Sequence, residues 1–328
     1  MNEYSASSER RVLVTGGTGF IGVPTTEWLV QLGEDVVVVD NFEVGERSRL
    51  DHLSDATNLT VRELDLRNRK AVEQAVHEIA PTHVIHLAAH HFIPFCIDHP
   101  SDTIEVNVAG TQYLLDALVP VQPERIIFAS TADVYQPAPH AHLEIDIIEP
   151  NNVYGASKRM GEQLMEFHQR RCQETDMVTT RFFNALGPGE TNPHLVPDIL
   201  DYLHDGDVLP LGNVDTRRDY IYTRDMARAL AMMLDGPEGN FTVNLGTGKS
   251  WTAREIVSRL GALLGRDLVI DTDPAKVRQS DRPLLQASTR RLSMLLPDFA
   301  TTDLDDALAA TLVGEGFELA SNVPARQL

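Results

Sequence analysis

Short runs of β-branched and aliphatic residues alternate with helical patterns through the first half of this 328-residue chain. Helical periodicity follows these runs, for example at Pro24–Leu32 and Arg69–Ile79. Such alternation is typical of right-handed crossovers that join parallel strands and place helices on both faces of one sheet. It predicts an α/β fold with strands at Val12–Thr15, Val36–Asp40, Leu59–Leu64, His83–Ala88, Arg125–Ser130, Val178–Phe183 and Phe241–Leu245.

Two later stretches break this alternation. Residues 187–217 are rich in proline and glycine, and residues 250–328 are mostly helical in pattern, with one short apolar strand at Leu268–Ile270. We therefore expect two units, each made of separate pieces of chain. The sheet unit comprises residues 1–184 and 219–247, and a smaller, discontinuous unit that caps a substrate comprises residues 185–218 and 248–328.

A glycine-rich segment, Gly-Gly-Thr-Gly-Phe-Ile-Gly at residues 16–22, lies between the first predicted strand and the first predicted helix. Its spacing suits a tight turn that brings the backbone close to a pyrophosphate at a helix N-terminus. Asp40 ends the next strand, where a carboxylate accepts hydrogen bonds from ribose hydroxyls and repels a 2′-phosphate. The pattern predicts NAD binding. Arg47 and Arg49 leave NADP as an alternative, and an Asp40 that merely caps a strand end is the bland interpretation.

Composition excludes several other classes of protein. The 28 basic and 48 acidic residues give a net charge of −20, which makes the basic face of a nucleic-acid binder hard to build. Two cysteines, Cys96 and Cys172, cannot form a disulfide framework, and no zinc-ligand spacing occurs, so we expect no metal. Residues 1–11 are polar and no apolar run approaches the roughly 18 residues of a membrane span. We expect a cytoplasmic protein.

Candidate acid–base residues follow the fifth predicted strand. Tyr154 and Lys158 are four residues apart at the start of a predicted helix, so both side chains lie on one face. A nearby ammonium favours the phenolate and brings a tyrosine toward acid–base work near neutral pH. Thr131 comes directly after that strand, where open parallel sheets place ligands. A cation packed on a surface tyrosine and a loop-capping threonine are the structural alternatives.

Together these residues resemble the extended short-chain dehydrogenase/reductase family, specifically its branch of NAD-dependent nucleotide-sugar epimerases and dehydratases. The resemblance runs from about Arg11 to Leu312 and rests on several motifs in the right order. The matching segments are VTGGTGFIG (14–22), DN (40–41), DL (65–66), HLAA (86–89), NVAGT (107–111), YGASK (154–158), RFFNALGPG (181–189), RRDYIYTRDMA (217–227) and NLGTGKS (244–250).

The resemblance implies a Rossmann-type doubly wound sheet and assigns each matching position a role. Toward the cofactor it implies contacts with pyrophosphate, adenosine ribose, adenine and nicotinamide from Gly16, Gly19, Phe20, Ile21, Asp40, Asn41, Asp65, Leu66, Leu87, Ala88, Ala89, Asn107 and Lys158. Thr131 and Tyr154 would face the 4-hydroxyl of the sugar. Toward the rest of the substrate it implies contacts with the diphosphate and base from Asn184, Arg218, Arg282, Leu195, Leu209 and Leu211, with Arg278 as a rival to Arg282.

The implied chemistry is transient oxidation at C4 of a nucleotide-sugar, followed by hydride return on the other face (epimerase) or by loss of water (dehydratase). Dehydratases of this family that act at C4 and C6 carry an Asp-Glu pair directly after the threonine. Here these positions are Ala132 and Asp133. Loss of the first carboxylate favours a 4-epimerase such as a UDP-glucose 4-epimerase, because elimination needs a paired acid and base. Asp133 keeps the dehydratase as the alternative.

Further alternatives concern the substrate and the assembly. His91 stands where the family usually has a small serine, and it is a candidate sugar donor, a pH-sensitive acid or a packed histidine. A non-catalytic NAD-binding protein is a rival from another class, as is a reductase with net cofactor turnover. The resemblance also implies a homodimer, with the helices that start near Asn107 and Tyr154 packed across a two-fold axis.

Overall fold

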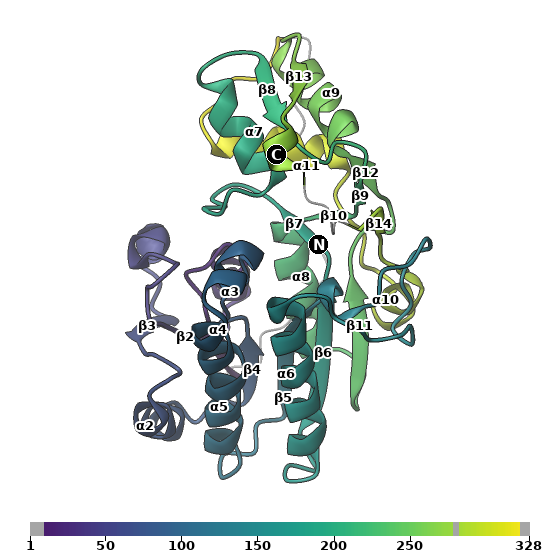
Figure 1. Cartoon of the computed structure of the whole chain (residues 1–328). Coiled ribbons are helices and arrows are strands. Elements are labelled where there is room, and N and C mark those ends of the chain that lie inside the picture. Colours follow the sequence, from purple (N-terminus) through teal and green to yellow (C-terminus); the bar gives the residue numbers. More distant parts are fainter. Residues whose placement is uncertain (1–9, 278–281, 322–328) are drawn as a thin grey trace.

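A seven-stranded sheet forms the larger unit (Figure 1). The computed structural model describes residues 10–277 and 282–321. The strand order is β11-β6-β5-β4-β1-β2-β3, and the neighbours pair in parallel. The parallel α/β fold predicted from the sequence is confirmed. Its strands are β1 (Arg11–Thr15), β2 (Asp35–Asp40), β3 (Leu59–Glu63), β4 (His83–His86), β5 (Arg125–Thr131), β6 (Asp176–Phe182) and β11 (Phe241–Leu245).

Successive residues of each strand enter different cores. Leu13 and Val37 belong to one cluster, whereas Val14 and Val38 belong to the other. Because helices cover both faces of the sheet, neither face is exposed to water, and the strands are therefore continuous runs of β-branched and aliphatic residues. One face is covered by α2 (Arg69–Ile79), α5 (Thr111–Leu118) and α6 (Val153–Gln169), and the other by α1 (Gly22–Gln31), α8 (Thr223–Leu234) and α10 (Arg290–Leu295).

The smaller unit has its own apolar core, formed mainly by three helices (Figure 1). These are α7 (Leu195–Leu203), α9 (Ala253–Leu264) and α11 (Leu304–Gly314). Helix α9 begins with a capping box: Thr252 accepts the backbone N–H of Glu255, whose carboxylate accepts that of Thr252. A parallel pair lies beside these helices, β8 (Val208–Leu211) with β13 (Val269–Thr272).

Short strand pairs connect the two units. Strand β7 (Asn184–Leu186) pairs with β10 (Tyr220–Tyr222), and β9 (Arg217–Arg218) pairs with β12 (Trp251–Thr252) and β14 (Leu284–Leu285). Helix α10 falls in the smaller unit of the predicted division, yet its Leu292 and the following Leu296 pack in the core of the sheet. The chain therefore returns to the sheet after it has entered the second unit.

The segment between β4 and α5 is built from three short helical pieces. They are α3 (Ile93–Asp98), α4 (Pro100–Ile104) and a π-helical stretch at Glu105–Gly110. The short 3₁₀ helices are Arg47–Leu53, Ala132–Val134 and Pro274–Lys276. Among the described residues, none of the helices combines the length and the apolar character that a membrane crossing needs.

Candidate active site

A cavity of about 1290 Å³ lies at the carboxyl edge of the sheet, between the sheet and the second unit. The loops after β1, β2, β4 and β5 form one side, and residues from 184–198, 211–218 and 275–285 contribute to the other. The strand order reverses between β1 and β4, which is where open parallel sheets bind ligands. Most residues singled out in the sequence meet here.

The glycine-rich turn after β1 lets the backbone approach the cavity closely. Gly16 has φ +72°, and a Cβ there would lie 2.7 Å from the backbone nitrogen of Ala88. At Gly22 a Cβ would lie 2.1 Å from the carbonyl oxygen of Gly16. Gly16, Gly19, Phe20 and Ile21 all line the cavity, beside the start of α1. This backbone cradle fits the pyrophosphate of NAD.

Asp40 ends β2 and lines the cavity beside this turn. Its Oδ2 accepts the Thr18 hydroxyl at 2.7 Å and the Thr18 N–H at 3.1 Å, and its Oδ1 accepts the Phe42 N–H at 3.0 Å. It thus braces the turn, and Oδ1, which has accepted one hydrogen bond, retains acceptor capacity for a ribose hydroxyl. Arg49 donates to the carbonyls of Thr18 and Gly189, so its guanidinium is committed to the backbone.

Of the remaining residues predicted to contact the cofactor, all but Asn107 line the cavity wall. Asp65 is paired with Arg67, whose hydrogen bonds outweigh burial and hold the pKa of the carboxyl below its usual value. The other residues of the wall are Asn41, Leu66, Leu87, Ala88 and Ala89.

Asn107 differs from its expected place, because it lies behind the cavity wall. Its amide is buried, accepts the N–H of His90 and donates to the His90 carbonyl, at 2.8 Å in both cases. Asn107 therefore shapes the loop that follows β4 instead of facing the cofactor.

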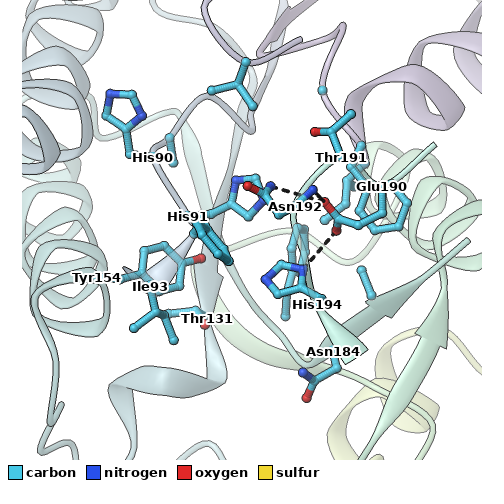
Figure 2. Close-up of a pocket in the computed structure, with 18 of the residues that line it drawn as sticks. His90, His91, Ile93, Thr131, Tyr154, Asn184, Glu190, Thr191, Asn192 and His194 are labelled. Atoms are coloured by element: carbon cyan, nitrogen blue, oxygen red, sulfur yellow. Dashed lines mark hydrogen bonds and ion pairs between the residues drawn. The ribbon is translucent and has the colours of Figure 1, made fainter. Parts of the chain in front are cut away.

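Thr131, Tyr154 and Lys158 converge on the cavity. Thr131 is the last residue of β5, and α6 begins at Val153, where Asn152 caps the helix by accepting the N–H of Gly155 at 2.8 Å. Tyr154 lies close enough to Thr131 for the threonine hydroxyl to lower the pKa of its phenol, and Figure 2 shows both side chains at the same side of the cavity. The sequence prediction of a shared site for these residues matches their placement.

The electrostatics of Tyr154 differ from the expectation. Burial raises the pKa of its phenol above the usual value, the Asp133 charge adds to this shift, and the hydrogen bond from Thr131 opposes it. Burial lowers the pKa of Lys158 to about 7, and its ammonium lies 4.9 Å from the centre of the Phe128 ring. An ammonium that is itself destabilised by burial gives the phenolate little support in the protein alone.

Asp133 follows Thr131 by two residues and is held by Arg282. The guanidinium of Arg282 donates to the Asp133 carbonyl at 3.1 Å and to the Ala132 carbonyl at 3.3 Å, and lies 3.5 Å from the Asp133 carboxylate. Arg282 also donates to the Asn151 side chain at 3.1 Å. Arg282 therefore links the second unit to the loop that follows β5.

The substrate side contains most of the other predicted residues. Asn184, Leu195, Leu211 and Arg218 line the cavity, and the side-chain oxygen of Asn184 is buried without a hydrogen-bond partner in the described part of the chain. Such an orphaned acceptor fits contact with a ligand.

One predicted substrate contact does not line the cavity, and another falls outside the described residues. Leu209 is fully buried in the core of the second unit, because it points inward from β8 under α7 and α9. Arg278 lies outside the described residues.

Sequence reasoning missed a polar wall of the cavity formed by Glu190, Asn192 and His194, which meets the predicted His91 (Figure 2). Asn192 Nδ2 lies 3.1 Å from His91 Nε2 and 3.2 Å from Glu190 Oε1. His194 Nδ1 lies 3.2 Å from Glu190 Oε2. The only sequence signal was a cluster of polar residues, Glu-Thr-Asn-Pro-His, in the irregular 187–217 stretch. No group of three or more His, Cys, Asp or Glu residues suited to a metal occurs in the described ranges.

Comparison with known proteins places this geometry in a family. The family model described as the NAD dependent epimerase/dehydratase family matches residues 12–246. The UDP-glucose 4-epimerase of Halalkalibacterium halodurans is 31% identical over 315 residues, covering 87% of this chain and 89% of that protein.

Solved structures agree over nearly the whole chain. The UDP-glucose 4-epimerase from Brucella ovis in complex with NAD has a TM-score of 0.85 at 30% identity, with 95% of this chain and 100% of that chain covered. A structure described as an NAD-dependent NDP-hexosamine 5,6-dehydratase, TunA, has a TM-score of 0.83 at 26% identity, with 94% and 98% covered. The chain belongs to the NAD-dependent epimerase/dehydratase family.

Proposed function

We propose that this protein is an NAD-dependent nucleotide-sugar 4-epimerase of the UDP-glucose 4-epimerase type. The observation that carries the proposal is the convergence of Thr131, Tyr154 and Lys158 on the cavity that the glycine-rich turn also lines. Relatives described as UDP-glucose 4-epimerases, which match along most of the chain, support the same reaction.

Bound in the cradle of the glycine-rich turn and Asp40, NAD would supply the hydride acceptor for oxidation at C4 of the sugar and the hydride donor for reduction on the opposite face. Tyr154, whose phenolate the positive nicotinamide ring would favour, takes the proton of the 4-hydroxyl at its phenolic oxygen as C4 is oxidised and gives it back as C4 is reduced. Thr131, which lies beside Tyr154 on the cavity, would help to orient the 4-hydroxyl toward that oxygen. Lys158 lies one helical turn along α6, on the same face as Tyr154, and is placed to hold the nicotinamide ribose.

The second unit would hold the rest of the nucleotide. Arg218 and Arg282 line the cavity and offer guanidinium donors to a diphosphate, and the unpartnered oxygen of Asn184 accepts a donor from the substrate. Leu195 and Leu211 supply apolar surface for the base. To bind a diphosphate, Arg282 would have to turn some of the guanidinium N–H groups that now contact Asp133 toward the phosphate oxygens.

A dehydratase remains the second candidate, because Asp133 lines the cavity next to Thr131. Elimination of water needs an acid and a base at the reacting carbons. Ala132 provides neither, and the carboxylate of Asp133 is paired with Arg282. Asp133 is therefore better suited to holding the loop than to proton transfer.

We also propose a homodimer in a reducing cytoplasm. Helices α5 and α6 pack against each other, and apolar side chains are exposed on or near them at Ile104, Met160 and Phe167. Light scattering at micromolar concentration should give twice the chain mass, and Phe167→Glu should shift it to one chain mass. A wild-type monomer at that concentration would contradict the dimer.

The test of the reaction is a panel of UDP-, dTDP-, GDP- and CDP-sugars incubated with the purified holoenzyme in D₂O and followed by proton NMR. We expect a 4-epimer without solvent deuterium at C5, because the hydride returns within the site. A 4-keto-6-deoxy or alkene product, or deuterium at C5, would establish the dehydratase instead. Stoichiometric consumption of added cofactor would indicate a reductase.

A further inference from the structure

The polar wall made of His91, Glu190, Asn192 and His194 lies across the cavity from Thr131 and Tyr154 (Figure 2). His91 comes from the loop after β4, and the other three come from the segment that leads into α7. Asn192 joins the two segments, which are 101 residues apart in the sequence. A sugar whose C4 faces Tyr154 would present its other substituents to this wall.

The hydrogen-bond directions in the wall follow from Glu190. A carboxylate only accepts, so the Asn192 atom that faces it must be the amide nitrogen. The same nitrogen donates its second hydrogen to His91 Nε2, which makes Nε2 an acceptor. The Glu190 carboxylate also accepts the Asn192 backbone N–H at 3.0 Å. Asn192 has thus used its donors within the wall, and its carbonyl oxygen is left as an acceptor.

The charge of the wall is set by the same contacts. Burial favours a raised pKa for Glu190, but the hydrogen bond and charge of His194 and the Asn192 N–H together hold it below the usual value. Burial lowers the pKa of His91, so its ring is neutral at neutral pH. His194 is paired with the Glu190 carboxylate, since its Nδ1 lies 3.2 Å from Oε2. The wall therefore carries no net positive charge.

The opposite side of the sugar region adds a second carboxylate. Asp133 lies beside Thr131, and its neighbour Arg282 is already paired with it. A sugar carboxylate that points toward the wall would thus face Glu190, and one that points to the opposite side would face Asp133, whereas sugar hydroxyls would find acceptors on Asn192 and Glu190.

We propose that the Glu190–Asn192 wall selects neutral, hydroxyl-bearing hexoses and rejects hexuronates, with Glu190 as the determinant of charge. This inference rests on the proposed nucleotide-sugar site, whose reaction it makes more specific. A uronate would lose the hydrogen bonds that the 6-hydroxyl of a hexose donates, and its carboxylate would be repelled by that of Glu190. The difference in affinity should therefore exceed what the loss of one hydroxyl alone produces.

The experiment compares UDP-glucose with UDP-glucuronate on the holoenzyme, with binding measured by calorimetry and epimerisation by NMR. We expect the wild type to bind UDP-glucose at least about 100-fold more tightly. Glu190→Gln, which keeps the shape and removes the charge, should narrow this ratio by at least about tenfold, mainly through tighter binding of UDP-glucuronate.

Glu315→Gln is the matched control. Glu315 accepts the N–H of Gly189, next to Glu190 in the same segment, and does not line the cavity. Its loss of charge should leave the binding ratio within about twofold of the wild type.

The outcomes separate this inference from the proposed reaction. Equal or tighter binding of UDP-glucuronate by the wild type overturns the inference, and this measurement does not depend on any variant folding. A folded Glu190→Gln enzyme with an unchanged ratio overturns the role of Glu190. Selective binding of UDP-glucose without epimerisation supports the wall and overturns the epimerase.

Discussion

The two halves of the cavity are built in different ways. On the cofactor side, a continuous turn of seven residues, Gly16–Gly22, presents its backbone to the cavity, and a Cβ added at Gly16, Gly17 or Gly22 would lie 2.7 Å or less from a neighbouring atom. On the sugar side, His91 and the segment at Glu190–His194 form a wall from side chains of two distant stretches. One half depends on the absence of side chains, and the other depends on their mutual orientation.

This difference predicts different responses to substitution. A backbone cradle fails when a Cβ is added at a crowded glycine, because most of the atoms around it are backbone atoms of the turn itself and of the loop after β4, which can move only if the turn opens. A side-chain wall changes its specificity when one hydrogen bond is removed, while the sheet beneath it stays intact. The following experiments would sharpen or break this contrast, beginning with the largest expected effect.

Gly22→Ala should abolish NAD binding. The added Cβ would lie 2.1 Å from the Gly16 carbonyl oxygen and 2.7 Å from Gly17, so the turn must open. We expect at least about 100-fold weaker NAD affinity and a loss of about 3 kcal/mol of stability, measured by cofactor content and urea denaturation. Gly206→Ala, where nothing lies within 4 Å, is the matched glycine and should keep both values. Normal NAD content in Gly22→Ala would refute the cradle.

Tyr154→Phe should lower kcat by roughly 10² to 10⁴-fold, because it removes the group that exchanges the proton of the 4-hydroxyl. NAD content and binding of the substrate should change little, since the ring remains in place. Steady-state kinetics and calorimetry check the two halves of this prediction. A variant with near wild-type kcat would mean that another group carries the proton.

Lys158 should make the stability of the nucleotide-free protein depend on pH. Burial lowers its pKa from 10.5 to about 7, so between these values the unfolded chain binds more protons than the folded chain. Stability therefore rises with pH from 7 toward 10.5. Lys158→Met should be more stable than the wild type at or below pH 7, by on the order of 3 kcal/mol, and the difference should shrink by pH 9. Urea denaturation at several pH values measures it, and a constant difference would contradict the shifted pKa.

Asn192→Ala should have the smallest effect. It removes the links to His91 and Glu190 on the sugar side and leaves the glycine-rich turn untouched. We expect KM for UDP-glucose to rise by about three- to tenfold, the cost of one or two hydrogen bonds, with no change in NAD content. A parallel loss of NAD would show that the two halves of the cavity are coupled.

Much of the fold and of the cofactor side could be predicted from the sequence. The runs at 36–39 and 126–129 are β-branched or apolar because both faces of the sheet are buried, and this demand is visible locally. The glycine-rich turn and the Tyr154–Lys158 spacing are equally local, since each lies within one turn or one helix. The contact of Arg282 with the loop after β5 could not be predicted from a local pattern, because it joins residues that are 149 or 150 positions apart.

The sequence by itself determined which segments are strands, where the glycine-rich turn lies and that Tyr154 and Lys158 share one helix face, because each of these depends on spacing within a short stretch. Only the tertiary structure decided that Asn107 supports the wall from behind, that Leu209 belongs to a core, and that His91 is tied to Asn192. It also decided that Tyr154 stays a phenol in the protein alone. The physical reason is that burial, charge and hydrogen-bond direction depend on neighbours that the fold brings from far along the chain.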